Sequence, residues 1–305
     1  ALDMAMTDLA MQGVVAMPTE QFDMSVQMPQ ALAAGFRVDG DMSFGGATGT
    51  FAFAGTDAET GAVQEGSGKF GSGASEYSFA MSADGMRYDG KSADQSMEVS
   101  ISDLPFPITY AVKEASGGIL MPLVKKDDPQ PFRLAYILSG LTLSDGIWAL
   151  FDPTGQLPRD PANLAVDVEG ETLVIRDLTD PALNQPQTDA SGMPVEPEVP
   201  FQPKSLKINR IALNAVGAGA EVTGALEFGD TPDQPVGRIE GTFQGVNGLM
   251  DKLVAMGILP QDQVMAARMM MAMFARPVEG EADKLATELE FREGGQIFAN
   301  GQQVK

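Results

Sequence analysis

The segment VMAARMMMAMFARP, residues 264–277, places five methionines within nine positions and carries more potential chemistry than any other stretch of the chain. Thioether sulfur binds Cu(I), and Met265, Met269 and Met273 recur every four residues, so a helix would carry them on one stripe. Cu(I) sites usually recruit Cys or His as well, and the chain contains neither. Methionine is also an adaptable filler of apolar space, and other methionines, such as Met4, sit at alternating strand positions. The pattern therefore favours the lining of an apolar core or groove over a metal site.

The same segment is a poor candidate for a membrane-inserting helix. Its polar side offers Gln261, Asp262, Gln263 and Arg268, whereas an interfacial helix carries Lys and Arg on that side and aromatic anchors on the other. No apolar run in the chain approaches the roughly 18 residues that a transmembrane helix needs. We therefore expect no transmembrane segment.

Other residue patterns that could do chemistry are weak. Without His and Cys, the chain cannot form Ser-His-Asp or Cys-His nucleophilic machinery or Cys/His zinc sites. Its 42 acidic residues give carboxylate pairs at every spacing, and nothing singles out two that would flank a substrate. The segments DGDMSFGG and ADGMRYDGKSAD lack the ligand spacing of an EF-hand, and GAGAEVTG lacks the Lys of a phosphate loop. We predict a non-enzymatic protein without cofactor or metal; a carboxylate-based hydrolase is the weaker alternative.

The net charge, the absence of Cys and the N-terminal residues indicate the compartment and the partners to expect. A net charge of −22 repels phosphate backbones, so we expect no nucleic-acid partner. A chain without Cys fits a protein that works outside the cytoplasm without needing disulfides. The sequence opens directly in strand-like alternation, ALDMAMTDL, with no Met start and no leader. We therefore expect an exported, periplasmic protein whose signal peptide, and further N-terminal sequence, precede Ala1.

The elements that would position these residues are mostly strands. Apolar and polar residues alternate in segments such as FDMSVQM, FRVDGDMSF and SMEVSIS, with Gly, Asp and Ser turns about every ten residues. This predicts a mainly β fold: a large, twisted, curved antiparallel sheet, half-barrel-like, whose alternate side chains form a continuous apolar concave face. Ser144 can cap a short central helix. Helical spacing returns in a C-terminal helix pair over residues 247–275, which we expect to cover one end of the sheet.

The prolines divide the chain. Residues 178–204 contain six prolines, scattered acids and no periodicity, which predicts a linker or long surface loop. We expect an N-terminal β-meander part over residues 1–177 and a C-terminal β part over residues 205–305, joined in one continuous sheet.

Two long segments carry a family resemblance. The stretch DPQPFRLAYILSGLTLSDGIWALFDPTGQLPRDPANLAVDVEGE and the stretch LVAMGILPQDQVMAARMMMAMFARPVEGEADKLATELEFREGGQIFANGQ resemble the alphaproteobacterial domain of unknown function numbered twenty-one twenty-five. The likeness runs from about Pro105 to the C-terminus and is looser before that. Members look like exported envelope proteins, which implies a signal peptide. The closing pattern is also similar to AsmA-like envelope proteins, whose curved sheets with an apolar groove are associated with lipid traffic; this is analogy at the level of the fold.

Two functions are compatible with these observations. The first is a non-enzymatic cell-envelope protein that binds or shelters an apolar ligand, such as a lipid, in the sheet. The second is a structural or interaction module with a self-filled core, which meets an envelope protein partner. For the first, the expected apolar lining is Met265, Met269, Met273, Phe274, Trp148 and Phe151. We expect the three methionines to be buried, and Arg268 to face solvent or pair with an acid.

Overall fold

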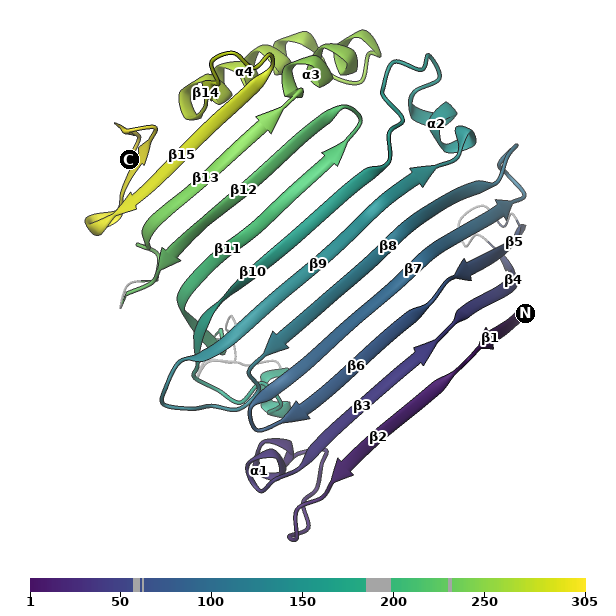
Figure 1. Ribbon diagram of the computed structural model, residues 1–305, viewed down its shortest axis with the longest axis vertical. Coiled ribbons are helices and arrows are strands. Elements are labelled where there is room, and N and C mark those ends of the chain that lie inside the picture. The colour runs from purple at the N-terminus through teal and green to yellow at the C-terminus, as the bar shows by residue number, and fades with distance from the viewer. Residues whose placement is uncertain (57–60, 62, 185–198, 230–231) are drawn as a thin grey trace.

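The computed structural model describes residues 1–56, 61, 63–184, 199–229 and 232–305. Within these residues the chain forms seventeen strands and four α-helices (Figure 1). The strands are β1 (Leu2–Thr7), β2 (Ala10–Ala16), β3 (Arg37–Phe44), β4 (Gly46–Thr56), β5 (Val63–Ser72), β6 (Ser75–Ser82), β7 (Gly85–Ile101), β8 (Ile108–Met121), β9 (Gln130–Leu143), β10 (Ala162–Val174), β11 (Phe201–Ala215), β12 (Ala218–Glu227), β13 (Val236–Gln244), β14 (Arg276–Pro277), β15 (Lys284–Arg292), β16 (Gln296–Ala299) and β17 (Gln302–Gln303). The α-helices are α1 (Met28–Ala33), α2 (Asp145–Phe151), α3 (Val246–Ala255) and α4 (Gln261–Phe274).

The strands form one open antiparallel sheet in which chain neighbours pair from β6 to β13, whereas the strands before β6 pair in a different order. From β7 through β13 each strand pairs with the next, β13 pairs with β15, and β15 pairs with β16. On the N-terminal side β6 pairs with β7 and β3, and β5 pairs with β7 and β4. The outermost strands there are β2, beside β3, and β1, beside β4. The predicted mainly β, twisted antiparallel sheet with a central helix and a C-terminal helix pair is confirmed.

The sheet continues across the predicted linker. Strands β10 and β11 pair from Asn163–Asn214 to Val174–Phe201, although they lie on opposite sides of residues 178–204. Most of that segment, residues 185–198, lies outside the described residues. Tight turns close the last hairpins: Gly294 and Gly295 link β15 to β16, and Asn300 and Gly301 link β16 to β17, all with positive φ.

A line of irregular residues crosses the N-terminal half of the sheet. Asp8 between β1 and β2, Asp94 in β7 and Gly140 in β9 have φ values of 52°, 47° and 69°. Gly45 and Gly73 separate β3 from β4 and β5 from β6 near the same level, and the Gly45 amide donates to the Thr7 carbonyl (2.9 Å). A residue in the left-handed region bends a strand and re-aims the side chains that follow it. The sheet is therefore creased along this line.

The alternation of apolar and polar residues shifts by one residue where a strand crosses the crease. In β7 the apolar residues Met86 and Tyr88 have even numbers before Asp94, whereas Met97 and Val99 have odd numbers after it. The same switch occurs between β1 and β2 and within β9. Because directly opposed residues share a face of an antiparallel sheet, the apolar residues remain on one side. We call this side the apolar face and the opposite side the polar face.

Most aromatic residues of the apolar face stand directly opposite a glycine. A Cβ atom at Gly90 would lie 2.9 Å from Cδ1 of Tyr77, and one at Gly66 would lie 2.6 Å from Cε1 of Phe53. The rings thus lie flat over the neighbouring backbone, where a side chain would exclude them. The opposed pairs in which the ring lies against the glycine are Phe51–Gly68, Phe53–Gly66, Phe70–Gly49, Tyr77–Gly90, Tyr136–Gly117 and Phe132–Gly170.

The helices contact the sheet at the two ends of its strands (Figure 1). At one end, α1 buries Ala31 and Leu32 together with Phe36 and Leu123. This cluster covers only the terminal row of the apolar face: Val38, Met81, Met86 and Met121. At the other end lie α2, α3 and α4. The largest buried hydrophobic cluster therefore lies at one end of the strands, and no described helix covers the middle of the sheet.

The first family-like motif, DGIWALFDP…LPRDP, builds a self-contained corner around α2. Trp148 is 7% exposed and packs on Phe151 with ring centroids 4.9 Å apart, and the Arg159 guanidinium lies 5.5 Å from the centre of the Trp148 ring. Arg159 also pairs with Asp145 (2.7 Å). Asp152 is fully buried and accepts hydrogen bonds from the backbone amides of residues 156 and 157. Its pKa lies below the ordinary value because these amide hydrogen bonds outweigh burial, which acts to raise it.

The second motif, FARPVEGE…NGQ, fastens the end of α4 to the last hairpin. The Asn300 side-chain amide donates to the Phe274 carbonyl (2.8 Å), and Arg276 donates to the Asn300 carbonyl (2.7 Å). The backbone amide of Glu288 donates to the Asn300 side-chain oxygen (3.0 Å). Both motifs therefore have a structural explanation.

Candidate functional site

The middle of the apolar face is the most unusual surface of the molecule. It crosses β7, β8, β9 and β11, where Leu134 is 44% exposed, Leu213 is 50% exposed, and Tyr88, Ile119 and Tyr136 are exposed as well. The helices contact the strand ends, so this part of the face meets no second layer among the described residues. Soluble proteins rarely expose a contiguous apolar surface of this extent, and where they do it usually marks a site of interaction.

The register brings these residues together. Tyr77, Gly90, Gly117 and Tyr136 are opposed in consecutive ladders across four strands. Tyr88 stacks on Tyr77 with ring centroids 6.4 Å apart. Partial burial raises the pKa of Tyr88, and Tyr77 adds to this shift, so the phenol stays neutral at physiological pH. The surface can therefore offer apolar contact and a few neutral hydroxyl groups, but no charge.

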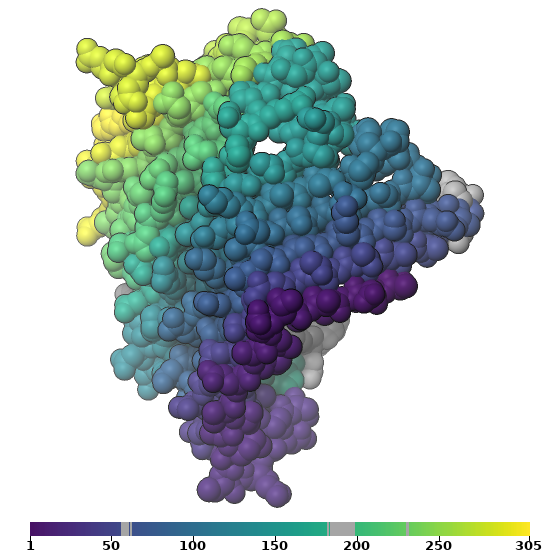
Figure 2. Space-filling model, turned by 45° about the vertical axis from the view of Figure 1, so that its right-hand side comes forward, coloured from purple at the N-terminus to yellow at the C-terminus, as the bar shows by residue number. Residues whose placement is uncertain are grey.

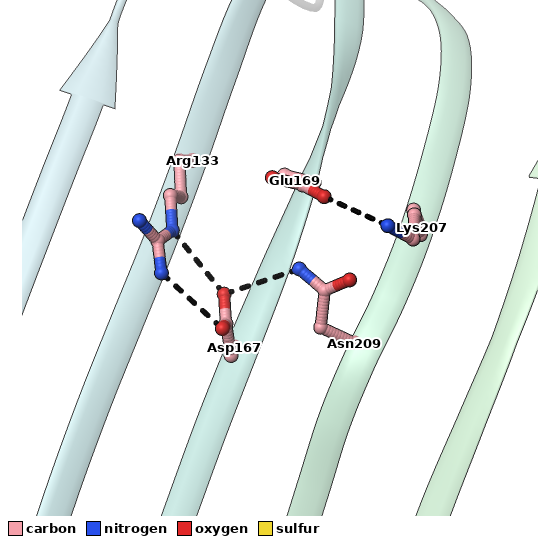
Figure 3. A network of polar contacts seen from close by, with 5 residues as sticks. All are labelled: Arg133, Asp167, Glu169, Lys207 and Asn209. Carbon is pink, nitrogen blue, oxygen red and sulfur yellow. Dashed lines mark hydrogen bonds and ion pairs between the residues drawn. The ribbon is translucent and has the colours of Figure 1, made fainter.

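The polar face has the opposite chemistry, with charges paired across strands (Figure 3). Arg133 in β9 donates to both oxygens of Asp167 in β10, at 3.3 and 3.2 Å, and Asn209 donates to the same carboxylate at 3.4 Å. Lys207 pairs with Glu169 at 3.2 Å. The hydrogen bonds from Arg133 hold the pKa of Asp167 below its ordinary value; burial opposes this shift, and Asn209 adds to it. The pKa of Glu169 is lowered as well, by hydrogen bonds from Asn209 and Lys207, so both carboxylates of this network are held in the charged form.

A hollow of about 880 Å³ over β2, β3 and β6–β9 takes most of its lining from the polar face. Small side chains such as Ser78, Gly118 and Ala135 leave room there, and Asp89 and Arg133 contribute charge. The hollow and the exposed apolar residues therefore lie mainly on opposite sides of the sheet. The physical reason is that the flat aromatic rings fill the apolar side, whereas the short polar side chains do not fill theirs.

The predicted burial of the α4 methionines is wrong. Met265, Met269 and Met273 are 63%, 71% and 61% exposed. The covered side of α4 carries Val264, which is buried, and Arg268, which pairs with Asp251 (2.8 Å) as predicted. Because α4 is apolar around most of its circumference, helical spacing could not tell which stripe would be covered. The helix lies along the strand ends and does not cover the apolar face (Figure 1).

The six predicted lining residues fall on two elements. Trp148 and Phe151 pack together in α2, where Trp148 is covered by Arg159, while Phe274 and the three methionines belong to α4. Whether any of them lines a ligand stays a prediction. Sequence reasoning missed the residues that form the exposed apolar face, among them Leu134 and Tyr136. The sequence pattern that could have indicated this face is the alternation in PFRLAYILSGLTL, together with too few predicted helices to cover so long a sheet.

Among the described residues, no group of three or more His, Cys, Asp or Glu side chains could hold a metal ion. The described helices include none that is long and apolar enough to cross a membrane.

Comparison with known protein families shows which family the chain matches. The family described as "Uncharacterized protein conserved in bacteria (DUF2125)" matches residues 10–299. No curated protein and no solved structure matches the chain. Since the match spans nearly the whole sequence, the chain belongs to this bacterial family of uncharacterised proteins.

Proposed function

We propose that this protein is a non-enzymatic, periplasmic cell-envelope protein that binds an apolar ligand, such as a lipid acyl chain, on the apolar face. The observation that carries the proposal is the uncovered middle of that face, where Leu134, Tyr136 and Ile119 are exposed although the sheet is large. The family resemblance and the Cys-free sequence support the proposed compartment.

The physical chemistry of the face suits a chain-like apolar ligand. Each methylene removed from water contributes about 0.8 kcal/mol, so even partial contact with an acyl chain supplies several kcal/mol. Flat rings over glycines leave a smooth surface along which a flexible chain can lie in more than one position. The net charge of −22 disfavours anionic headgroups, so we expect neutral or zwitterionic lipids to bind better than anionic ones.

The second candidate is an interaction module in which a partner protein of the envelope covers the same face. An exposed apolar surface rimmed by polar residues is also the signature of a protein interface. A partner would bury the face permanently, whereas a lipid would exchange. The two functions are therefore separated by what purifies with the protein.

The test begins with native mass spectrometry and lipid extraction of the protein purified from its own envelope. We expect copurified lipid, and saturable binding of a fluorescent fatty acid to the delipidated protein. Two β9 residues of equal exposure give matched variants: Leu134 on the apolar face and Ile137 on the polar face, 44% and 45% exposed. Leu134→Gln should weaken probe binding several-fold, whereas Ile137→Gln should leave it unchanged.

Three results would count against lipid binding. They are the absence of lipid together with the absence of probe binding, equal effects of the two variants, and a stoichiometric protein partner in place of lipid. The last result would favour the interaction module. Fractionation of cells that express the natural gene tests the compartment, and a cytoplasmic location would refute the envelope assignment.

A further inference from the structure

The N-terminal edge of the sheet is long, and no strand among the described residues pairs with its outer side. Strands β1 and β2 line this margin over residues 2–16, at the purple border of the space-filling view (Figure 2). Nearly all their side chains are exposed, including Met4, Met11 and Val15. Natural edge strands are usually blunted by Lys, Pro or shortness. This one has no Lys, Arg or Pro, and its only charges are Asp3 and Asp8.

The free backbone groups of this edge can be assigned. Ala1 and Ala52 exchange both backbone hydrogen bonds, each at 2.9 Å, so Ala1 and the alternate residues after it direct their N–H and C=O groups toward β4. The residues between them, Leu2, Met4 and Met6, direct theirs to the open side. In an L-peptide strand of fixed direction, the face that carries the side chain fixes the side to which the N–H points. The apolar-face residues of β2 therefore also point outward.

The opposite edge of the sheet is different. It ends in β16 and β17, of four and two residues, and turns back at Asn300. A head-to-tail assembly would need to pair a long edge with this short one. Pairing of the long edge with itself requires nothing from the C-terminal side.

We propose that two copies of this chain pair through residues 2–15 as antiparallel strands, with the two-fold axis between Asp8 and Leu9. In this register Met6 faces Met11 of the partner, Met4 faces Gly13 and Leu2 faces Val15. The apolar residues are even-numbered before Asp8 and odd-numbered after it. Apolar residues therefore face apolar residues only where an even-numbered residue of one copy opposes an odd-numbered residue of the other, as Met6 opposes Met11. A two-fold axis between antiparallel strands is perpendicular to the sheet, so the apolar faces of the two copies continue into one another.

The charges agree with this register. Asp3 faces Val14 and Asp8 faces Leu9, so no two carboxylates oppose each other across the axis. Like charges directly opposite one another would destabilise the pair. The edge is therefore self-complementary in its hydrogen bonds, apolar side chains and charges.

The register can be tested by disulfide capture, because the chain contains no Cys. Full-length M6C and M11C variants are oxidised separately and as an equal mixture. The mixture should give a crosslinked dimer, since opposed Cα atoms lie about 5.5 Å apart in such a pair. Each variant alone should not, because two copies of residue 6 would lie five residues apart along the strand, about 16 Å. Crosslinking of either variant with itself to the same extent as in the mixture would refute the register.

Association itself is tested by sedimentation of the unmodified chain over a concentration series. We expect a reversible dimer that the double variant M6K/M11K abolishes, because it sets Lys against Lys on both sides of the axis. The control V14K places Lys opposite Asp3 and should retain or strengthen the dimer. Circular dichroism confirms that each variant is folded. A monomer at all concentrations, or a dimer that survives M6K/M11K in a folded protein, would overturn the proposal. The crosslinking of M6C with M11C tests the register even if a lysine variant fails to fold.

Discussion

The flat aromatic rings of the apolar face can be tested at Gly66. In Gly66→Ala, the new Cβ would lie 2.6 and 2.9 Å from Cε1 and Cε2 of Phe53, against an ordinary carbon–carbon contact of about 3.5–4.0 Å. The three nearest heavy atoms all belong to the Phe53 ring, so this ring must lift off the backbone by about 1 Å. Displacement from a preferred rotamer costs about 0.5–1.5 kcal/mol, and loss of the cross-strand pair costs about 0.2–1 kcal/mol.

An opposing contribution must be separated from this cost. Replacing Gly by Ala in a strand stabilises by about 0.5–1 kcal/mol where the methyl has room. Gly55 provides the matched control, since a Cβ there meets no atom within 4 Å. Gly55→Ala should raise the free energy of unfolding slightly, whereas Gly66→Ala should be neutral or destabilising. In the Phe53→Ala background, Gly66→Ala should become stabilising as well.

The assay is urea unfolding followed by far-ultraviolet circular dichroism on the four proteins of the Phe53/Gly66 cycle and on Gly55→Ala. The expected coupling between Phe53 and Gly66 is about 1–2 kcal/mol, well above the error of a double-mutant cycle. A coupling near zero, with Gly66→Ala and Gly55→Ala equally stabilising, would refute the account of rings lying over glycines. That account underlies the flatness of the proposed ligand surface.

Three further predictions follow from the described contacts. Hydrogen peroxide should convert the exposed α4 methionines to sulfoxides at least about tenfold faster than the buried Met250, as measured by peptide mass spectrometry; equal rates would mean that something covers α4. Arg133→Met should raise the pKa of Asp167, measured by carbon NMR titration, yet cost under about 1 kcal/mol in the free energy of unfolding because the pair is exposed. Because the pKa of Asp152 is lowered in the folded protein, its stabilising effect should be complete above the ordinary value of 3.8 and be lost as the pH falls below it. Trp148 fluorescence should therefore report acid loosening of the α2 corner, and Asp152→Asn should be loosened already at neutral pH.

Strand alternation predicts the sheet well because it reports directly which residues share a face. The same holds for the turns, where Gly294 and Asn300 mark the last hairpins, and for the helix pair, where the period changes. Helical spacing was less informative for α4. It correctly places Met265, Met269 and Met273 on one stripe, but a helix that is apolar nearly all round gives no information about which stripe meets a neighbour.

The exposed apolar face lay beyond sequence reasoning for a different physical reason. An alternating strand predicts one apolar side, and the usual inference is that something covers it. Here no described element covers Leu134 and Tyr136, and only the three-dimensional placement of the helices at the strand ends reveals this. The crease was visible in the sequence as a change of parity around Asp8 and Asp94. Its meaning depends on their positive φ values, which Asp adopts more readily than most residues but which its presence does not dictate.

The two proposals use separate parts of the same sheet and can fail independently. Ligand binding would use side chains in the middle of the apolar face, such as Leu134, whereas pairing would use backbone groups of the edge around Met6. A dimer would extend the apolar face across the two-fold axis without adding a second layer, so it would lengthen a ligand surface rather than close it. The edge variant M6K/M11K should consequently become monomeric and still bind the fatty-acid probe, and Leu134→Gln should bind the probe several-fold more weakly and still dimerise. If either variant loses both properties while remaining folded, the edge and the face form one site, and the apolar surface is completed only between two copies.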